Sequence, residues 1–301
     1  MSDCVLACRQ VSEIEREIAT QPGCWREAAR RAASLGNVLP PAGARVEAIG
    51  CGTSLFMAQA YAGRREGLGR GETDAFPASE APRDRRYEAI LAISRSGTTT
   101  EVRDCLRALR GVRRIAMVAV ADTPVADAAD AVVTLEFADE RSVVQTRFAT
   151  SSLALLRAHL GEDLEPVIAL AEAALDAEPP IDPDQYSHYV FLGQGWGAAL
   201  ANEGALKLRE AAQAWTESYP AMEFRHGPIS AAGADTVVWA VGPVDDAVLR
   251  DAASTGAAVV GGVRDPMAEL IAIQKTAVAL AEARGLDPDH PSHLTRSVVL
   301  S

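Results

Sequence analysis

The stretch Leu91-Ala-Ile-Ser-Arg-Ser-Gly-Thr-Thr-Thr-Glu101 decides the fold class of this sequence. Residues 89–93 are all apolar, which predicts a short buried strand, and they lead directly into small hydroxyl residues around one glycine. A segment rich in helix-forming residues, 101–109, follows at once. A strand that passes through such a turn into a helix is typical of α/β proteins with parallel sheets.

The same turn has the composition of an anion-binding site. The first backbone N–H groups of a helix have no partner inside the helix, so they can bind a phosphate. Gly97 allows close approach of the backbone, and Arg95 adds a permanent positive charge. In the alternative interpretation Thr99 or Thr100 is an ordinary N-cap of a surface helix. Five hydroxyl groups around one glycine favour the anion site: Ser94, Ser96, Thr98, Thr99 and Thr100.

Length and charge limit the possible functions. A chain of 301 residues is long enough for two domains, and 48% hydrophobic residues are sufficient for a large core. The net charge is -12, from 41 acidic and 29 basic residues, and it would repel a nucleic-acid backbone. A single phosphate remains compatible with an acidic protein because one pocket can be locally positive.

The five cysteines, Cys4, Cys8, Cys24, Cys51 and Cys105, are scattered and show no paired spacing. They indicate reduced thiols of a cytoplasmic protein rather than disulfides or a zinc site. The sequence start lacks the pattern of a signal peptide, and no apolar stretch reaches transmembrane length, so no membrane partner is expected.

Repeated strand, turn and helix units predict a parallel sheet covered by helices on both faces. We expect strands at residues 45–49, 73–80, 89–93, 114–120 and 131–135, and helices at 11–35 (two, interrupted by 21–23), 55–66, 101–109 and 151–176. A second glycine-rich turn, Gly50-Cys-Gly-Thr-Ser54, precedes the helix at 55–66. Ligands of such sheets collect at the carboxyl ends of the strands, where both turns lie.

The pattern begins again after residues 178–184, which have the composition of an interdomain linker. Strands are expected at 188–192, 237–241 and 257–261, and a closing helix at 266–285. Aligning Ala48-Ile-Gly-Cys-Gly52 with Phe191-Leu-Gly-Gln-Gly195 gives an offset of 143 residues (191 minus 48). This weak internal repeat is what two related domains would show.

Glu203, Lys207 and Glu210 fall on one face of an expected helix because they are spaced i, i+4 and i+7. A solvated charged stripe is the more frequent meaning of this spacing. Gly204 and the neighbouring Ala and Leu residues leave little of this helix for water, which favours a partly dry cleft. Desolvation raises the proton affinity of a carboxylate, so Glu210 is a candidate base near neutral pH.

His226 lies in the stretch Glu223-Phe-Arg-His-Gly-Pro228, a polar turn before a proline. This turn could hold an imidazole facing a ligand. A single histidine is more often a structural hydrogen-bonding residue, so both interpretations stay open on the residues alone.

Four segments in this order resemble tandem sugar-isomerase (SIS) domains. They are Gly50-Cys-Gly-Thr-Ser54, Ile93-Ser-Arg-Ser-Gly-Thr-Thr99, Glu203-Gly-Ala-Leu-Lys-Leu-Arg-Glu210 and Glu223-Phe-Arg-His-Gly-Pro228. Such domains form the C-terminal end of glucosamine-6-phosphate synthase, and they occur in stand-alone glucosamine-6-phosphate deaminases, ketose/aldose isomerases and fructosamine-6-phosphate deglycases. The resemblance implies an α/β fold of two SIS domains, each a parallel sheet flanked by helices in a flavodoxin-like three-layer sandwich.

The implied organisation is an N-terminal helical lead at 1–40, a first SIS domain at 41–180, a second at 181–285, and a C-terminal tail at 286–301 that closes over the site. The family also implies a phosphosugar ligand, no metal or redox cofactor, and a homodimer.

By the resemblance, Glu210 moves a proton between C1 and C2, and His226 opens the sugar ring from a neighbouring subunit. Lys207 and Arg296 complete the expected catalytic group. The expected substrate-binding residues are Gly52, Thr53, Ser54, Ser94, Arg95, Ser96, Thr99 and Gln145.

The sequence departs from the synthase pattern in three places. Cys4 and Cys8 precede only a short helical segment, so we expect no glutaminase domain and no ammonia made in this chain. Arg296 stands where the synthase has a lysine able to form an imine, and arginine stays protonated, so it is expected to stabilise an enediolate by charge instead. Arg95 replaces a glutamine and adds positive charge beside the phosphate.

The resemblance therefore implies a phosphosugar isomerase or deaminase, with glucosamine 6-phosphate or a related amino-sugar phosphate as the expected substrate and fructose 6-phosphate and ammonia as the expected products. A fructosamine-6-phosphate deglycase and a non-catalytic sugar-phosphate sensor are alternatives, although no basic helix-turn-helix segment is present for DNA binding. A dinucleotide oxidoreductase is disfavoured because Leu55 stands where G-x-G-x-x-G has its third glycine.

Overall fold

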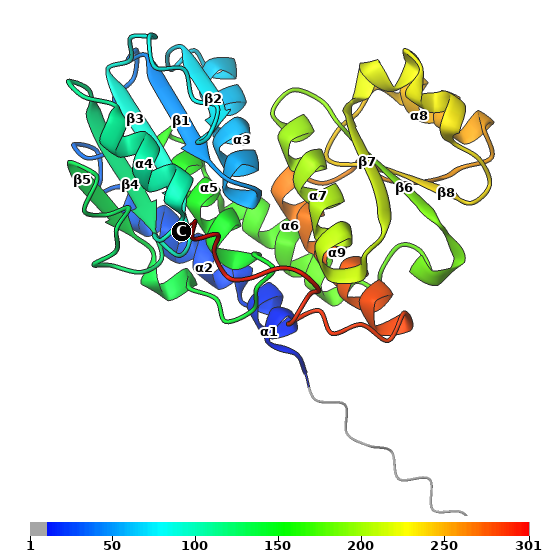
Figure 1. Cartoon of the computed structure of the whole chain (residues 1–301). Helices are drawn as coiled ribbons and strands as arrows, with labels where there is room; N and C mark the ends of the chain where they lie inside the picture. The colour runs from blue at the N-terminus through cyan, green and yellow to red at the C-terminus, as the bar shows by residue number, and fades with distance from the viewer. Residues whose placement is uncertain (1–10, 301) are drawn as a thin grey trace, which may run out of the picture.

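The structure is a computed structural model that describes residues 11–300. Cys4 and Cys8 lie outside the described residues. The expectation that was based on them, that no glutaminase domain is present, is therefore not tested by the structure. Two parallel β-sheets stand side by side with helices between and around them (Figure 1). The predicted α/β class, with parallel sheets flanked by helices, is confirmed.

The first sheet has the strand order β2-β1-β3-β4-β5, and its neighbouring strands are all parallel. Its strands are β1 (Val46–Gly50), β2 (Thr73–Pro77), β3 (Ala89–Ser94), β4 (Arg113–Val118) and β5 (Ala131–Thr134). Every residue of β1 and β3 is buried, as expected of central strands with helices on both faces. This is the flavodoxin-like strand order, whose ligands bind where the order reverses, between β1 and β3.

The second sheet has the order β7-β6-β8-β9 and is also parallel throughout. Its strands are β6 (His188–Gly193), β7 (Trp215–Pro220), β8 (Thr236–Ala240) and β9 (Ala258–Gly261). The central strands β6 and β8 therefore occupy the places of β1 and β3 in the first sheet.

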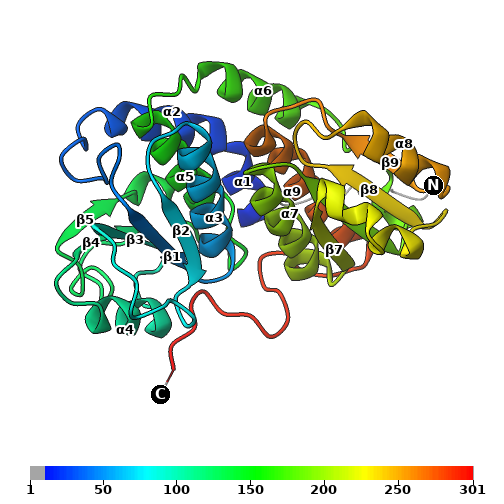
Figure 2. The same cartoon turned by 90° about the horizontal axis from the view of Figure 1, so that it is seen from above.

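Helices α3 (Thr53–Gly67) and α7 (Gly197–Ala212) pack against each other between the two sheets (Figure 2). Helices α4 (Thr100–Ala108) and α8 (Asp246–Ser254) lie on the outer faces. The remaining helices are α1 (Glu13–Ala19), α2 (Gln21–Ala32), α5 (Arg147–His159), α6 (Glu165–Asp176) and α9 (Pro266–Ala283). Within residues 11–300, no helix combines the length and the apolar character needed to cross a bilayer.

One apolar cluster joins the two sheets. It includes Ile14 of α1, Leu91 of β3, Leu200 of α7 and Trp239 of β8, all at most 2% exposed. Burial of this shared surface fixes the position of one sheet relative to the other. The domain boundaries expected from the sequence stay a prediction, because a shared core does not mark a boundary.

The structure corrects several expected elements. The helix expected at 151–176 is two helices, because Gly161 adopts a positive φ of +93° after α5 and Pro166 then lies in the first turn of α6. Gln21-Pro-Gly23 does not interrupt a helix but forms the first turn of α2, where proline is tolerated. Strand β7 and helix α8 were not expected from the sequence.

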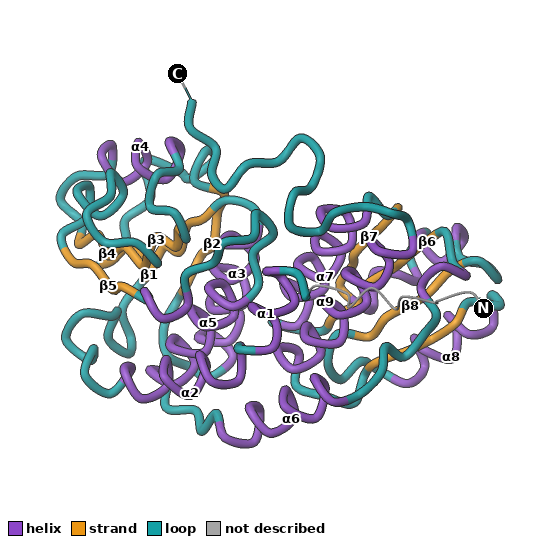
Figure 3. Tube along the Cα trace, turned by 90° about the horizontal axis from the view of Figure 1, so that it is seen from below, coloured by secondary structure: helices purple, strands orange, loops and turns teal. Residues whose placement is uncertain are grey.

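The C-terminal tail, residues 286–300, runs from the end of α9 back to the first sheet (Figure 3). On its way the Asp289 carboxylate accepts hydrogen bonds of 2.8 Å from the backbone N–H groups of Glu13 and Ile14, and so caps α1. The tail reaches the N-terminus of α4, where the backbone N–H of Thr100 donates to the carbonyl of Val298 (3.3 Å).

Candidate active site

Two glycine-containing turns meet at the carboxyl ends of β1 and β3, which are adjacent strands. A Cβ on Gly50 would lie 2.6 Å from the backbone carbon of Ser54, so only glycine allows α3 to start this close to β1. Gly97 has a φ of +65°, and a Cβ there would lie 2.1 Å from Thr123 Oγ1. Both turns are therefore held in one tight conformation at the switch point of the sheet.

We call residues Ser94–Thr99 the hydroxyl turn. Thr99 is the N-cap residue of α4, yet its side chain makes no capping hydrogen bond. Its hydroxyl lies 3.5 Å from that of Ser94, and the Thr98 hydroxyl donates to Ser96 Oγ at 3.0 Å. The ordinary N-cap interpretation of this threonine is thus not what the structure shows, and its hydroxyl can reach a ligand.

A small pocket of about 30 Å³ opens at the hydroxyl turn. Its lining residues are Cys51, Ser54, Ile93, Ser94, Arg95, Ser96, Thr99, Val102, Gln145 and Arg296. Pockets that enclose whole ligands are roughly ten times larger. Only the end group of a ligand can enter, and serine and threonine hydroxyls are suitable donors to an anionic group.

Arg95 is 2% exposed, and its guanidinium makes hydrogen bonds to backbone carbonyls. It donates to the carbonyl oxygens of Ser142 (2.9 Å), Val143 (3.0 Å) and Arg296 (3.0 Å). Burial lowers the pKa of Arg95, and the Glu140 carboxylate at 3.6 Å counteracts this. Arg95 therefore holds the loop at 140–146 and the C-terminal tail against the pocket by hydrogen bonds. Its direct contact with a phosphate stays a prediction.

Arg296 lies beside the pocket in the tail. Its guanidinium pairs with Asp139 Oδ1 at 2.5 Å and donates to the Glu140 carbonyl. A hydrogen bond of 2.9 Å joins the hydroxyl of the next tail residue, Ser297, to the hydroxyl of Thr98 in the hydroxyl turn. The tail thus covers one side of the pocket, and the role of Arg296 in stabilising an enediolate remains a prediction.

A buried charged cluster lies on α7, directly across from α3. The Lys207 ammonium contacts Glu210 Oε2 at 2.6 Å, Glu203 Oε1 at 3.2 Å and Thr53 Oγ1 at 3.0 Å. The side chains of Lys207 and Glu203 are 1% and 2% exposed, and that of Glu210 is 20% exposed. The three residues predicted to share one helix face do so, in a dry environment and not as a solvated stripe.

Burial raises the pKa of Glu203 to about 7, although the neighbouring Lys207 lowers it. For Lys207, burial acts to lower the pKa, but Glu203 and Glu210 together leave it raised, so the lysine stays charged. A cluster of two carboxylates and one lysine can hold or release one proton near neutral pH. Proton transfer between adjacent carbons requires such a group.

The pocket and the charged cluster are joined at two points. Ser54 lines the pocket, and Thr53, the residue before it, contacts both Lys207 and Glu203. Gln145 also lines the pocket, and its backbone carbonyl accepts a hydrogen bond of 3.0 Å from Lys207. An end group held at the hydroxyl turn therefore leaves the rest of a ligand close to the cluster.

His226 and Gly52 lie at the surface. His226 follows the 3-10 turn Ala221–Arg225, is exposed, and makes no side-chain hydrogen bond within the described residues. Gly52 precedes α3 with a φ of +55° and is exposed at the turn. Neither contacts the charged cluster inside one chain, so their expected roles remain predictions.

Sequence reasoning did not identify three glutamates that support the site. Glu203 was seen only as part of a helix face, although it is the most deeply buried carboxylate of the cluster. Glu17 of α1 accepts from the backbone N–H groups of Arg141 (2.5 Å) and Ser142 (3.4 Å), and Glu140 accepts from the N–H groups that begin α5. No local pattern marks Glu17 and Glu140, because their partners are far away in the chain or are backbone groups, and the i, i+4 spacing of Glu203 and Lys207 does not show how deeply Glu203 is buried.

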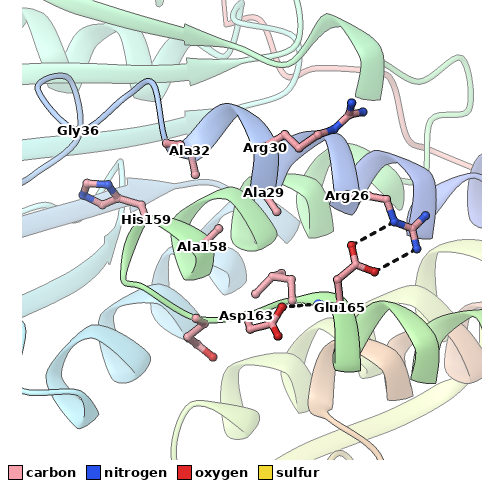
Figure 4. A pocket seen from close by; sticks show the side chains of 12 residues that line it. Arg26, Ala29, Arg30, Ala32, Gly36, Ala158, His159, Asp163 and Glu165 are labelled. Atoms are coloured by element: carbon pink, nitrogen blue, oxygen red, sulfur yellow. Dashed lines mark hydrogen bonds and ion pairs between the residues drawn. The ribbon is translucent and has the colours of Figure 1, made fainter.

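Another surface groove, of about 770 Å³, lies elsewhere, between α2 and the α5–α6 turn (Figure 4). Its charged groups are paired with each other: Arg26 bonds Glu165 (3.2 Å) and Glu172 (3.2 Å), and Glu162 is held by Arg64 and Arg157. The His159 ring is bonded to the Pro40 carbonyl at 3.2 Å. Satisfied groups leave little for a polar ligand, so we place the active site at the hydroxyl turn.

The chain is 24% identical to a glutamine–fructose-6-phosphate aminotransferase (isomerizing) of Thermotoga maritima, over 85% of this chain and 52% of that protein. The chain thus spans about half the length of the curated relatives it matches. No protein-family model matches the sequence.

Among solved structures, a glucosamine-6-phosphate deaminase of Thermotoga maritima superposes with a TM-score of 0.85, at 25% identity, over 96% of this chain and 100% of that one. A tagatose-6-phosphate ketose/aldose isomerase of Escherichia coli superposes with a TM-score of 0.77, at 18% identity, over 94% and 98% of the two chains. The relatives and structural neighbours are phosphosugar enzymes of the sugar-isomerase type, including the isomerase part of the synthase.

Proposed function

We propose that this protein converts glucosamine 6-phosphate, or a closely related amino-sugar phosphate, to fructose 6-phosphate and ammonia. The observation that carries the proposal is the direct connection between a small hydroxyl-lined pocket and a buried Glu-Lys-Glu cluster. The similarity to a solved glucosamine-6-phosphate deaminase supports this choice of substrate.

In the proposed reaction the phosphoryl group enters the pocket at the hydroxyl turn, where Ser54, Ser94, Ser96 and Thr99 donate hydrogen bonds. The sugar ring opens with the help of His226. Glu210 then takes the proton from C2 and returns it to C1, which converts the amino aldehyde through an enolamine into a C2 ketimine. Water adds to C2 and ammonia leaves, so one water is consumed for each ammonia released.

Lys207 has two roles in this scheme. Its charge compensates the carboxylate of Glu210, and its position, fixed by four contacts, orients that carboxylate. Glu203 shares the same lysine, so the protonation of Glu203 changes the charge that Glu210 experiences.

Simple aldose–ketose isomerisation of a neutral sugar phosphate is the second candidate. The solved tagatose-6-phosphate isomerase has the same fold, and the proton transfer by Glu210 would be the same. The two reactions differ only in the last step, because a neutral sugar gives a ketose without hydrolysis.

The test measures ammonia and ketose separately after incubation with amino and neutral hexose 6-phosphates. We expect ammonia and ketose in equal amounts from glucosamine 6-phosphate. Glu210→Gln should lower this rate by about 1,000-fold, since positioned proton transfer contributes roughly that much. Glu172→Gln, which removes an exposed carboxylate on α6, is the matched control and should leave the rate unchanged. Ketose without ammonia would select the isomerase instead.

The proposal also includes a homodimer in which His226 completes the site of the other subunit. Mixing Glu210→Gln with His226→Asn subunits then restores activity to about a quarter of the wild-type level, because half of the dimers contain one intact site. Sedimentation measures the oligomeric state. Mixtures without any activity, from subunits that do exchange, would place His226 in the site of its own subunit. A His226→Asn variant that is fully active by itself would place His226 outside any site.

A further inference from the structure

Gln145 stands between the two parts of the site. Gln145 is one of the residues that line the pocket at the hydroxyl turn, and its backbone carbonyl accepts a hydrogen bond of 3.0 Å from Lys207. It is the one residue among the described ones that both lines this pocket and bonds the charged cluster directly. A ligand whose end group is in the pocket must pass Gln145 to bring its reacting carbons to the cluster.

The polar groups around Gln145 are already engaged. The carbonyls of Ser142 and Val143 accept from Arg95, and the N–H and hydroxyl of Thr146 donate to Glu140. On the other side of the loop the hydroxyl of Ser142 donates to Glu17. These bonds come from α1, β3 and the loop itself, so the backbone at 140–146 is fixed before any ligand binds.

Among the described residues of this region, three buried side-chain atoms lack a hydrogen-bond partner in the protein: Arg95 Nε, Glu140 Oε2 and Gln145 Oε1. The other polar atoms of the Arg95 and Glu140 side chains are bonded, so Gln145 differs from them because its whole amide is without a partner within the same residues. Its Oε1 atom is buried and has no hydrogen-bond partner in the protein, and no side-chain hydrogen bond is made by its Nε2 within residues 11–300. A buried polar atom without a partner costs about 1–3 kcal/mol of stability. A rigid loop that retains such a group at the wall of a pocket is understandable when a ligand supplies the partner.

The chemistry of the amide indicates which part of the ligand it meets. A phosphoryl group only accepts hydrogen bonds, and the pocket already offers it the hydroxyls of Ser54, Ser94, Ser96 and Thr99. An amide both donates and accepts, and a sugar hydroxyl does the same, so the two groups can satisfy each other.

We propose that Gln145 is a specificity-determining residue whose side-chain amide hydrogen-bonds a hydroxyl on the carbon chain of the sugar phosphate, between the phosphoryl group and the carbons that react. This inference rests on the function proposed above. It defines the ligand class as polyhydroxylated phosphates and excludes short phosphates that lack a hydroxyl at that distance.

The experiment compares two probes by isothermal titration calorimetry. Inorganic phosphate tests the pocket alone, and glucitol 6-phosphate, an open-chain hexitol that has no carbonyl group to isomerise, tests the pocket together with the hydroxyl chain. Gln145→Met keeps the length of the side chain and removes its hydrogen bonds. We expect it to weaken glucitol 6-phosphate binding about 5- to 10-fold and to change phosphate binding less than about 2-fold.

Gln185→Met, at an exposed glutamine far from the pocket residues in sequence, is the control and should change neither affinity. An equal loss of both affinities would show that Gln145 binds the phosphoryl group, and unchanged affinities would show that it binds neither part; both results overturn the inference. A wild-type protein that binds phosphate but not the hexitol phosphate would overturn the proposed substrate class itself, which is a different result.

Discussion

The turns after β3 and β8 occupy equivalent places in the two sheets but have opposite chemistry. The first is the hydroxyl turn, in which the N-cap residue Thr99 leaves its side chain free. In the second, residues 241–246, the Asp245 carboxylate caps α8 by accepting from the Ala247 N–H at 2.7 Å, and Asp246 adds another negative charge. The fold is repeated, but at the N-cap position the first turn has a hydroxyl where the second has a carboxylate, while each helix has one acidic residue in its first turn, Glu101 in α4 and Asp246 in α8. A hydroxyl at this position favours an anion more than a carboxylate does.

The turns after β1 and β6 show the same division. Gly52 and Gly195 both have a φ of +55°, so the backbone turn is shared. The next residue is Thr53 in the first turn, where it contacts Lys207, and Trp196 in the second, where Arg157 stacks 4.8 Å from the ring centre. The residue after this glycine therefore has a hydroxyl group near the candidate site in the first sheet and an aromatic ring used for packing in the second. The charged residues of the site come from α7 instead.

Lys207→Met should have the largest effect. It removes the single cation of the Glu203–Lys207–Glu210 cluster on α7. Two carboxylates, Glu203 and Glu210, would remain without their partner in a dry place. We expect activity to be lost and the free energy of unfolding to fall by about 3–5 kcal/mol, measured by urea denaturation.

A double variant, Lys207→Met with Glu203→Gln, separates the two effects. Removing the buried charge of Glu203 should recover part of the stability but none of the activity. If the single variant proves as stable as the wild type, the cluster is not the desolvated ion pair described here.

Gly97→Ala should come next, with a loss of about 3 kcal/mol from a left-handed backbone and the close contact with Thr123. Gly195→Ala in the second half is the matched control: its φ of +55° is similar, but no atom lies within 4 Å of the added Cβ, so about 1 kcal/mol is expected. Thermal unfolding of both variants measures the difference. Equal losses would mean that Gly97 is required only for its φ.

The sequence was sufficient to predict the parallel sheets, both glycine turns and the common face of Glu203, Lys207 and Glu210. These features depend on local pattern: apolar runs give strands, and a spacing of three and four residues gives a helix face. Strand β7 was missed because its residues, Trp-Thr-Glu-Ser-Tyr-Pro, mix polar and aromatic types and lie at a half-exposed sheet edge.

Long-range contacts could not be predicted from local pattern. Arg95 was expected to point to the phosphate, but its orientation depends on the carbonyls of Ser142, Val143 and Arg296, the last 201 residues away in the chain. The packing of α1 against the loop at 140–146 through Glu17 is a similar case. Such pairs are set by the tertiary fold and leave no periodic signal.

Thr99→Asp gives the first turn the N-cap of the second and so tests their difference directly. The new carboxylate would cap α4 and repel an anion in the pocket, so phosphate affinity should fall about 100-fold while thermal stability stays equal or rises. Calorimetry with inorganic phosphate measures the affinity. The reciprocal Asp245→Thr should leave phosphate binding unchanged; tighter binding or a second bound phosphate in this variant would place an anion site at α8 as well.

The central strands β1 and β6 differ in charge at one buried position, which provides the smallest of these effects. Glu47 and Val190 are equivalent: each is the buried residue three places before the glycine that ends its strand, and the register pairs them with Asp74 and Glu217. Both carboxylate oxygens of Glu47 are buried without a hydrogen-bond partner. Burial, and to a smaller extent the charge of Asp74, raise the pKa of Glu47 from 4.5 to about 7, against the partly opposing charges of Arg83 and Arg85.

Because the folded protein holds this proton more tightly than the unfolded chain, the contribution of Glu47 to stability is complete below pH 4.5 and is lost as the pH rises through 7. We expect the wild type to lose about 2 kcal/mol of unfolding free energy on this account between pH 5 and pH 8. Glu47→Val, which copies the second sheet, and Glu47→Gln should both remove that part of the pH dependence, measured by urea denaturation at the two pH values. Only Glu47→Val should also be more stable than the wild type at pH 5, since the amide of glutamine would remain without partners. If the unfolding free energy of both variants falls as much between pH 5 and pH 8 as that of the wild type, the titrating group is another residue. Glu47 would then be ionised or paired in the folded protein throughout this pH range.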